Sequence, residues 1–127
     1  MDIVDAHQSL SSWASNKPLV ARLWIFGSRA RGDHRADSDL DVAIQLDLSA
    51  AKGMDESGGL ATWMFDTEGW EDELAALLPF TIDLQQYRGE ATPTIHQALT
   101  RSSQLVYTKR DAQQFNQANA ASRHGLT

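Results

Sequence analysis

The chain has 127 residues and a formal net charge of −6 at pH 7, from 11 basic and 17 acidic side chains. That length has room for one hydrophobic core, so we expect residues 1–127 to form a single domain. Apolar residues make up 42% of the chain and charged residues 22%, which is typical of a globular protein and excludes a disordered one. The acidic balance argues against a nonspecific binder of duplex DNA, so any phosphate chemistry must depend on a local site or on metal ions.

The sequence contains no cysteine, which excludes disulfides, thiol nucleophiles and cysteine-ligated metals. The apolar run at residues 23–26 is far too short to cross a bilayer. Asp2 and Asp5 stand where a secretory signal would carry basic residues. These features predict a cytoplasmic protein that has no membrane partner.

Hydrophobic spacing predicts alternating helices and strands along the chain. We expect strands at residues 20–26, 40–46, 80–85 and 104–108, and helices at residues 3–15, 28–32, 60–78, 95–101 and 111–121. Gly69 is placed to split the long central helix in two, and residues 47–59 read as a flexible connection. The order predicts an α/β (α+β) fold in which a small mixed sheet carries its helices mainly on one face.

Residues 27–32 read Gly-Ser-Arg-Ala-Arg-Gly and directly follow the first predicted strand. Gly27 lets the backbone approach a bulky anion without a Cβ in the way, and the helical turn that follows directs free N–H groups toward that anion. Ser28 adds a hydroxyl donor, and Arg29 and Arg31 add positive charge. We interpret the segment as a phosphate cradle and expect one of the two arginines to face the phosphates, while the other is a surface cation.

Three acids point to a metal site. Asp39 and Asp41 are two residues apart on a predicted strand, so their side chains share a face. Two adjacent carboxylates repel each other unless a cation keeps them ionised, and Mg²⁺ prefers such oxygen ligands. Asp83 interrupts another apolar strand, where it would complete the cluster or help to deprotonate a hydroxyl, or would simply face solvent. Ser38, just before the pair, could contact substrate or cap a turn.

The combination of Gly27-Ser28, Gly32, Asp39 and Asp41 resembles the signature of the DNA polymerase β nucleotidyltransferase superfamily. The sequence of residues 27–32 is similar to that of the minimal nucleotidyltransferase group, which includes antitoxins paired with HEPN-domain toxins. The resemblance covers roughly residues 20–108. It implies that Asp39, Asp41 and Asp83 are catalytic carboxylates binding two Mg²⁺ ions, and that Gly27 and Ser28 hold the triphosphate of ATP or another nucleoside triphosphate.

Three functions remain open at this point. The first is an enzyme that transfers AMP from ATP to a hydroxyl, by resemblance a tyrosine of a partner HEPN-type toxin. The second is a non-catalytic antitoxin that neutralises a toxin by covering it. The third is the catalytic subunit of a small-molecule nucleotidyltransferase of the aminoglycoside-modifying type, whose acceptor site another chain would supply.

Overall fold

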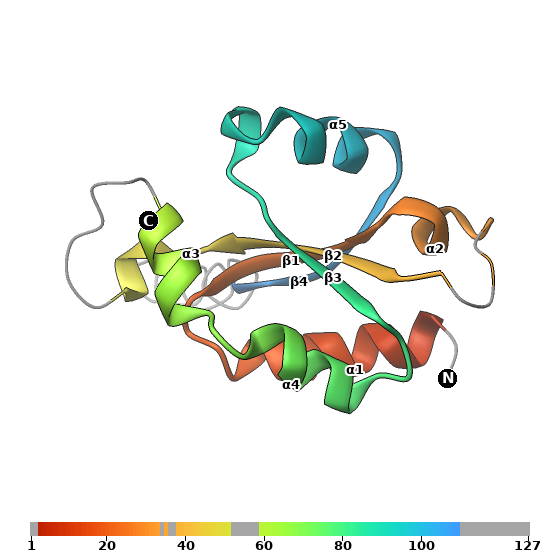
Figure 1. Cartoon of the computed structure of the whole chain (residues 1–127), viewed down its shortest axis with the longest axis horizontal. Helices are drawn as coiled ribbons and strands as arrows, with labels where there is room; N and C mark the ends of the chain where they lie inside the picture. Colours follow the sequence, from red (N-terminus) through yellow and green to blue (C-terminus); the bar gives the residue numbers. More distant parts are fainter. Residues whose placement is uncertain (1–2, 34, 36–37, 52–58, 110–127) are drawn as a thin grey trace, which may run out of the picture.

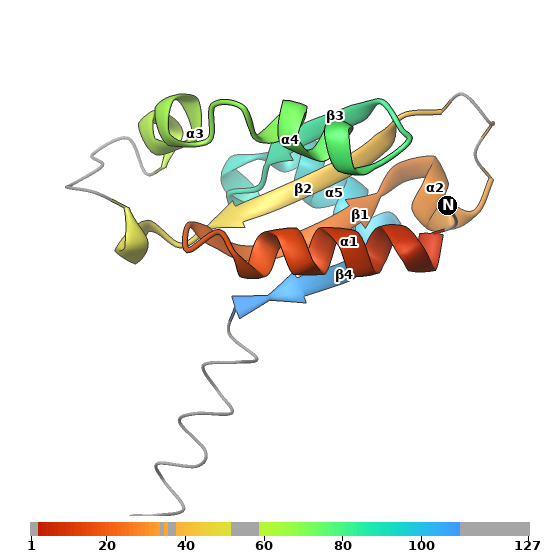
Figure 2. The same ribbon diagram turned by 90° about the horizontal axis from the view of Figure 1, so that it is seen from below.

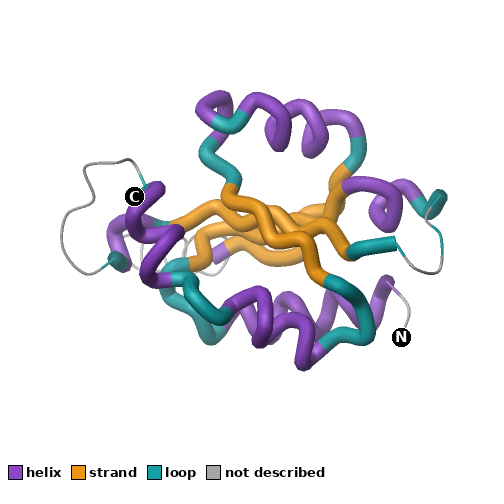
Figure 3. The backbone as a smooth tube through the Cα atoms, viewed as in Figure 1, coloured by secondary structure: helices purple, strands orange, loops and turns teal. Residues whose placement is uncertain are grey.

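A computed structural model describes residues 3–33, 35, 38–51 and 59–109 of the chain. Within these residues a four-stranded mixed sheet lies between helices (Figures 1 and 3). The strands are β1 (Val20–Phe26), β2 (Leu40–Leu46), β3 (Ile82–Gln86) and β4 (Ser103–Thr108). The helices are α1 (Ile3–Ser15), α2 (Gly27–Arg31), α3 (Leu60–Asp66), α4 (Trp70–Leu77) and α5 (Pro93–Arg101).

The strand order across the sheet is β3-β2-β1-β4. β1 runs antiparallel to both β2 and β4, whereas β2 and β3 are parallel. A parallel pair needs a crossover connection, and here α3 and α4 supply it. The two strands that carry the predicted acids are therefore neighbours, and the acids lie near the start of each strand.

The hydrophobic core lies between the sheet and the pair α1 and α4 (Figure 2). Alternate residues of β1 and β2 point into it, as the period of two in a strand requires. They are fully buried: Leu23, Ile25, Leu40, Val42 and Ile44. The indoles of Trp13 and Trp70 meet edge to face, with centroids 5.2 Å apart, and join the two helices. Asp41 lies between Leu40 and Val42 and so faces away from this core.

The opposite face of the sheet carries α5 (Figure 1). Trp24 of β1 packs edge to face on Tyr87, which follows β3, with ring centroids 5.2 Å apart. The Tyr87 hydroxyl is 2.7 Å from His96 Nδ1 of α5. This aromatic cluster holds α5 over the face toward which Asp41 and Asp83 point.

The predicted fold class is confirmed, with α5 on the face opposite α1 and α4. The predicted helix at 60–78 divides at Gly69 into α3 and α4. β3 begins at residue 82 instead of 80, because the chain is still crossing from α4 after Pro79 and pairs only from Ile82 onward. The predicted helix at 111–121 lies outside the described residues. None of the helices that the structure describes is long and apolar enough to cross a membrane.

Candidate active site

The turn after β1 brings the glycine loop (residues 27–32) against Asp41. β1 and β2 are antiparallel with Phe26 opposite Asp41, so Gly27 lies beside that carboxylate. Gly27 has φ +75°, a conformation that favours glycine, and a Cβ at this position would lie 2.2 Å from Asp41 Oδ2. The close approach of loop backbone to carboxylate therefore requires glycine.

The parallel register of β2 and β3 brings the second acid to the first. Asp41 and Asp83 are direct partners across the two strands. Their carboxyl groups lie close enough for Asp83 to raise the pKa of Asp41, and the Gln85 side-chain amide donates to Asp83 Oδ1 at 2.8 Å. Two carboxyl groups placed side by side favour a bound cation, because a positive charge between them offsets their repulsion.

Burial raises the pKa of Asp41 from 3.8 to about 6, with further contributions from the negative charges of Asp83 and Asp39. Arg31 opposes the shift through its positive charge. A carboxyl whose pKa is raised by burial and by neighbouring acids lies in a site suited to binding a cation, and such groups are concentrated at functional sites.

The three acids are within electrostatic reach of one another, but they do not form a complete cage. In the stretches that the structure covers, no three His, Asp or Glu side chains are arranged to hold a metal ion. Asp39 lies just before β2 and its side chain is exposed. The oxygen-only donor pair Asp41–Asp83 still fits the preference of Mg²⁺, and Asp39 would join it by turning its side chain toward the same face.

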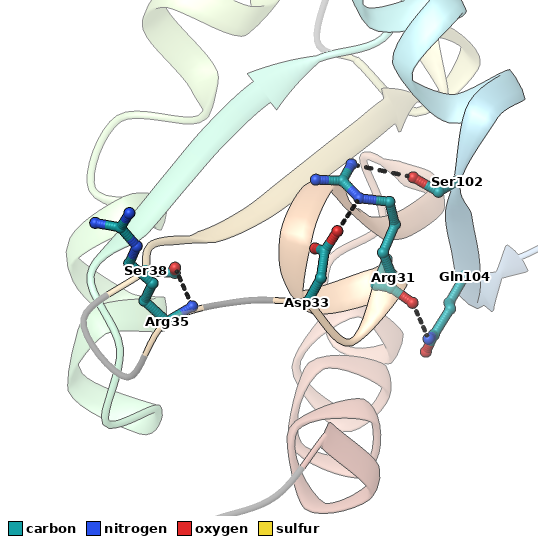
Figure 4. Close-up of polar contacts among 7 residues, drawn as sticks. Arg31, Asp33, Arg35, Ser38, Ser102 and Gln104 are labelled. Atoms are coloured by element: carbon teal, nitrogen blue, oxygen red, sulfur yellow. Dashed lines mark hydrogen bonds and ion pairs between the residues drawn. The ribbon is translucent and has the colours of Figure 1, made fainter.

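In the rest of the glycine loop, Ser28 is half-buried and Arg31 is exposed. The Ser28 carbonyl accepts hydrogen bonds from Gly32 N at 2.9 Å and Asp33 N at 3.1 Å. The Arg31 side chain donates to Asp33 Oδ2 at 3.0 Å and toward Ser102 Oγ at 3.5 Å (Figure 4). Because α2 has only five residues, its dipole is small, and the side chains of the loop rather than the dipole would have to supply most of any attraction for an anion.

Arg29 and Ser38 have contacts within the protein. The Arg29 side chain is 9% exposed and donates from Nε (3.0 Å) and Nη2 (2.8 Å) to the Ser38 carbonyl. The Ser38 hydroxyl accepts a hydrogen bond from Arg35 N at 2.9 Å, the turn-capping alternative noted for it from sequence (Figure 4). Of the two arginines that the sequence offered, Arg29 is therefore buried and only Arg31 is exposed.

Gln85 is the site residue that sequence reasoning did not single out. It orients Asp83 through the hydrogen bond from its side-chain amide. Its position gave a usable signal, since a polar residue two places after an acid on a strand shares its face.

A cavity of about 260 Å³ opens at the far ends of β2 and β3, with Gln45 and Tyr87 among its lining residues. Gln45 is four residues beyond Asp41, or about 13 Å at about 3.3 Å per residue. The cavity is therefore separate from the acids.

A comparison with protein families shows to which family the chain belongs. Residues 8–112 match the family described as "Polymerase beta, Nucleotidyltransferase". The chain belongs to this nucleotidyltransferase family. The resemblance found from Gly27, Ser28, Asp39 and Asp41 is thereby confirmed.

Individual relatives within and around this nucleotidyltransferase family are distant. The chain is 29% identical over 100 residues to the protein adenylyltransferase MntA of Shewanella oneidensis, and the match covers 79% of this chain and 63% of that protein. The fold is similar to that of a toxin–antitoxin crystallised with AMP-PNP, at TM-score 0.56 and 21% identity over 93% of this chain and 87% of that one. It is also similar to a mutant of the MntA–HpeT toxin–antitoxin, at TM-score 0.54 and 20% identity over 94% and 87%.

Proposed function

We propose that the chain is a Mg²⁺-dependent nucleotidyltransferase that moves AMP from ATP to a hydroxyl group. The observation that carries this proposal is the position of Asp41, which touches the glycine loop on one side and Asp83 on the other. A triphosphate held by the loop would thus lie against the acids. When bound, two Mg²⁺ ions would neutralise charge that develops on the phosphate oxygens.

The residues of the chain divide the remaining work. Gly27 and Ser28 hold the phosphates, and Arg31 offers an exposed positive charge to them. Asp39, Asp41 and Asp83 supply the metal ligands. Asp83 also accepts the proton of the acceptor hydroxyl. The acceptor oxygen forms a bond to the α-phosphorus while the bond from that phosphorus to the bridging oxygen breaks, and pyrophosphate leaves with the electron pair.

The comparisons support a protein acceptor. The Shewanella relative is named a protein adenylyltransferase, and the two similar structures are toxin–antitoxins. We therefore infer that the acceptor is a tyrosine of a partner toxin of the HEPN type and that the chain acts as its antitoxin. The chain spans 63% of the length of that relative, so the relative's activity and partners enter here as part of the proposal.

The test mixes the chain with Mg²⁺, ATP labelled on the α-phosphate and the candidate partner. Asp39→Asn, Asp41→Asn and Asp83→Asn should each lower label transfer by at least about 100-fold, since each removes a ligand charge at the reacting phosphate. Asp72→Asn, an exposed acid of α4, is the matched control. Absence of transfer by the wild-type chain, or full transfer by Asp41→Asn, would overturn the proposal.

Exposed apolar side chains on α3 favour the second candidate, neutralisation by binding alone. Leu60, Met64 and Phe65 are 47%, 61% and 71% exposed, more than a solvated helix face needs. If this candidate holds, Asp41→Asn still neutralises the partner and Phe65→Ser weakens the complex. If catalysis is the function, Asp41→Asn abolishes neutralisation while the complex still forms.

A further inference from the structure

Arg29 links three parts of the candidate site. It belongs to α2, between Ser28 and Arg31, the two side chains assigned to the phosphates in the proposed function. Its guanidinium donates two hydrogen bonds to the carbonyl of Ser38, the residue that precedes Asp39. Its Cζ also lies 4.3 Å from the ring centroid of Phe80, in the segment that leads into β3.

The two contacts meet where β2 and β3 begin. The Ser38 carbonyl belongs to the planar peptide unit that enters Asp39, so holding that oxygen fixes the direction of the backbone there. The next tie is the hydrogen bond of 2.8 Å from Leu40 N to Thr81 O, between the segments that lead to Asp41 and Asp83. Arg29 and this hydrogen bond therefore fasten the same two segments together.

Arginine is the side chain suited to this position. Its planar fork can aim two N–H groups at one oxygen while its face stacks on an aromatic ring, whereas a lysine ammonium can do only one of the two. Burial of the group at 9% exposure excludes water from both contacts, which strengthens them.

We propose that Arg29 is a positioning residue that holds the Ser38–Asp39 peptide and the Phe80 segment against α2, and so sets the spacing of the metal-binding acids. This inference rests on the proposed function, because it assumes that Asp39, Asp41 and Asp83 bind a divalent cation. It replaces the phosphate-binding role that the sequence allowed for Arg29.

The test measures Mn²⁺ affinity by electron paramagnetic resonance, without nucleotide and well below the melting temperature. Arg29→Met should weaken Mn²⁺ binding by about 10–100-fold, the range found when a group that orients metal ligands is removed. Arg29→Lys should lie between Arg29→Met and the wild type. Arg101→Met, at an exposed arginine of α5, should leave the affinity unchanged.

A second variant tests the aromatic contact and guards against misfolding of the first. Phe80→Leu should also weaken Mn²⁺ binding. The double variant Arg29→Met/Phe80→Leu should bind Mn²⁺ no more weakly than Arg29→Met alone, because both substitutions remove the same Arg29–Phe80 contact. If the losses of Mn²⁺ affinity in the two single variants add fully in the double variant, Arg29 and Phe80 do not act through one contact.

Further readouts separate the other roles of Arg29 from positioning. If Arg29 binds phosphate, Arg29→Met weakens ATP binding in EDTA, and the inference fails. If Arg29 only stabilises the fold, the melting temperature falls while the Mn²⁺ affinity of the folded protein is unchanged, and the inference fails. Absence of Mn²⁺ binding by the wild-type chain also overturns it. If the wild-type chain binds Mn²⁺ and Arg29→Met does not, but neither transfers label, the inference stands and the proposed function fails.

Discussion

Alanine at Gly27 tests the contact between the glycine loop and Asp41. Two effects follow from the geometry. The first is the cost of φ +75° for a residue with a Cβ, about 1–2 kcal/mol. The second is the collision of that Cβ with Asp41 Oδ2 at 2.2 Å. Ordinary contact needs roughly 1 Å more than this, and the carboxylate can yield it by rotating away from the loop.

Gly32→Ala is the matched control, because it has the cost of a positive φ without the collision. Gly32 has φ +83°, and a Cβ on it meets nothing within 4 Å. Both variants should therefore lose about 1–2 kcal/mol of stability, or roughly 4–8 °C in melting temperature. Only Gly27→Ala displaces the carboxylate, and a displacement of about 1 Å at a reacting centre costs on the order of 100-fold in rate.

The assay compares label transfer from ATP by the two variants at a temperature where both are folded, and follows the Asp41 carboxyl by NMR titration. We expect transfer to fall about 100-fold for Gly27→Ala and less than about 5-fold for Gly32→Ala. The pKa of Asp41 should move from its value of about 6 only in Gly27→Ala. Equal rates for the two variants, or an unmoved Asp41 pKa in Gly27→Ala, would refute the reasoning.

Three further predictions concern stability. The folded chain holds a proton on Asp41 to about pH 6, whereas the unfolded chain releases it near pH 3.8. In the absence of divalent ions, the free energy of unfolding should therefore fall as pH rises from 3.8 to about 6. Urea titrations of Asp41→Asn should lack this pH dependence. Leu74→Ala, at a fully buried residue of α4, should cost about 2–5 kcal/mol in the same assay, and a loss below about 1 kcal/mol would contradict its place in the core. Hydrogen bonds from Lys109 and Ser49 lower the pKa of Asp47, so this carboxylate should stabilise the fold above its ordinary pKa and lose that contribution as pH falls further. Lys109→Met should therefore cost about 0.5–1 kcal/mol at pH 7 and less at pH 3, and an equal cost at the two pH values would contradict the role of the ion pair.

The local elements follow from the sequence wherever one pattern dominates. Residues 20–26 and 40–46 were predicted as strands with the bounds that β1 and β2 have, because β-branched and alternating apolar residues are closed off by Gly27 and Asp47. The start of β3 was predicted two residues early, because Phe80 is apolar without pairing to β2. Composition alone does not distinguish an apolar crossing segment from a paired strand.

The sequence was enough to predict the residues of the candidate site, but not how the fold brings them together. Asp39 immediately precedes β2 and Asp41 lies within it, so their closeness follows from a spacing of two in the sequence. The pairing of Asp41 with Asp83 depends on the strand order and register, which are set by the packing of residues far apart in the sequence. The role of Arg29 was out of reach for the same reason, since its acceptor is a backbone carbonyl nine residues away, and carbonyls are the same at every position.

The parallel register of β2 and β3 also decides when a folding chain can bring Asp41 and Asp83 together. Side chains alternate between the two faces, so a slip of one residue would send Asp83 to the interior and leave Leu84 opposite Asp41. The hairpin of β1 and β2 can form early from nearby residues, but β3 must cross back through α3 and α4 before it docks. A folding intermediate in which β3 is undocked therefore has the glycine loop and Asp41 in place but lacks the Asp41–Asp83 pair.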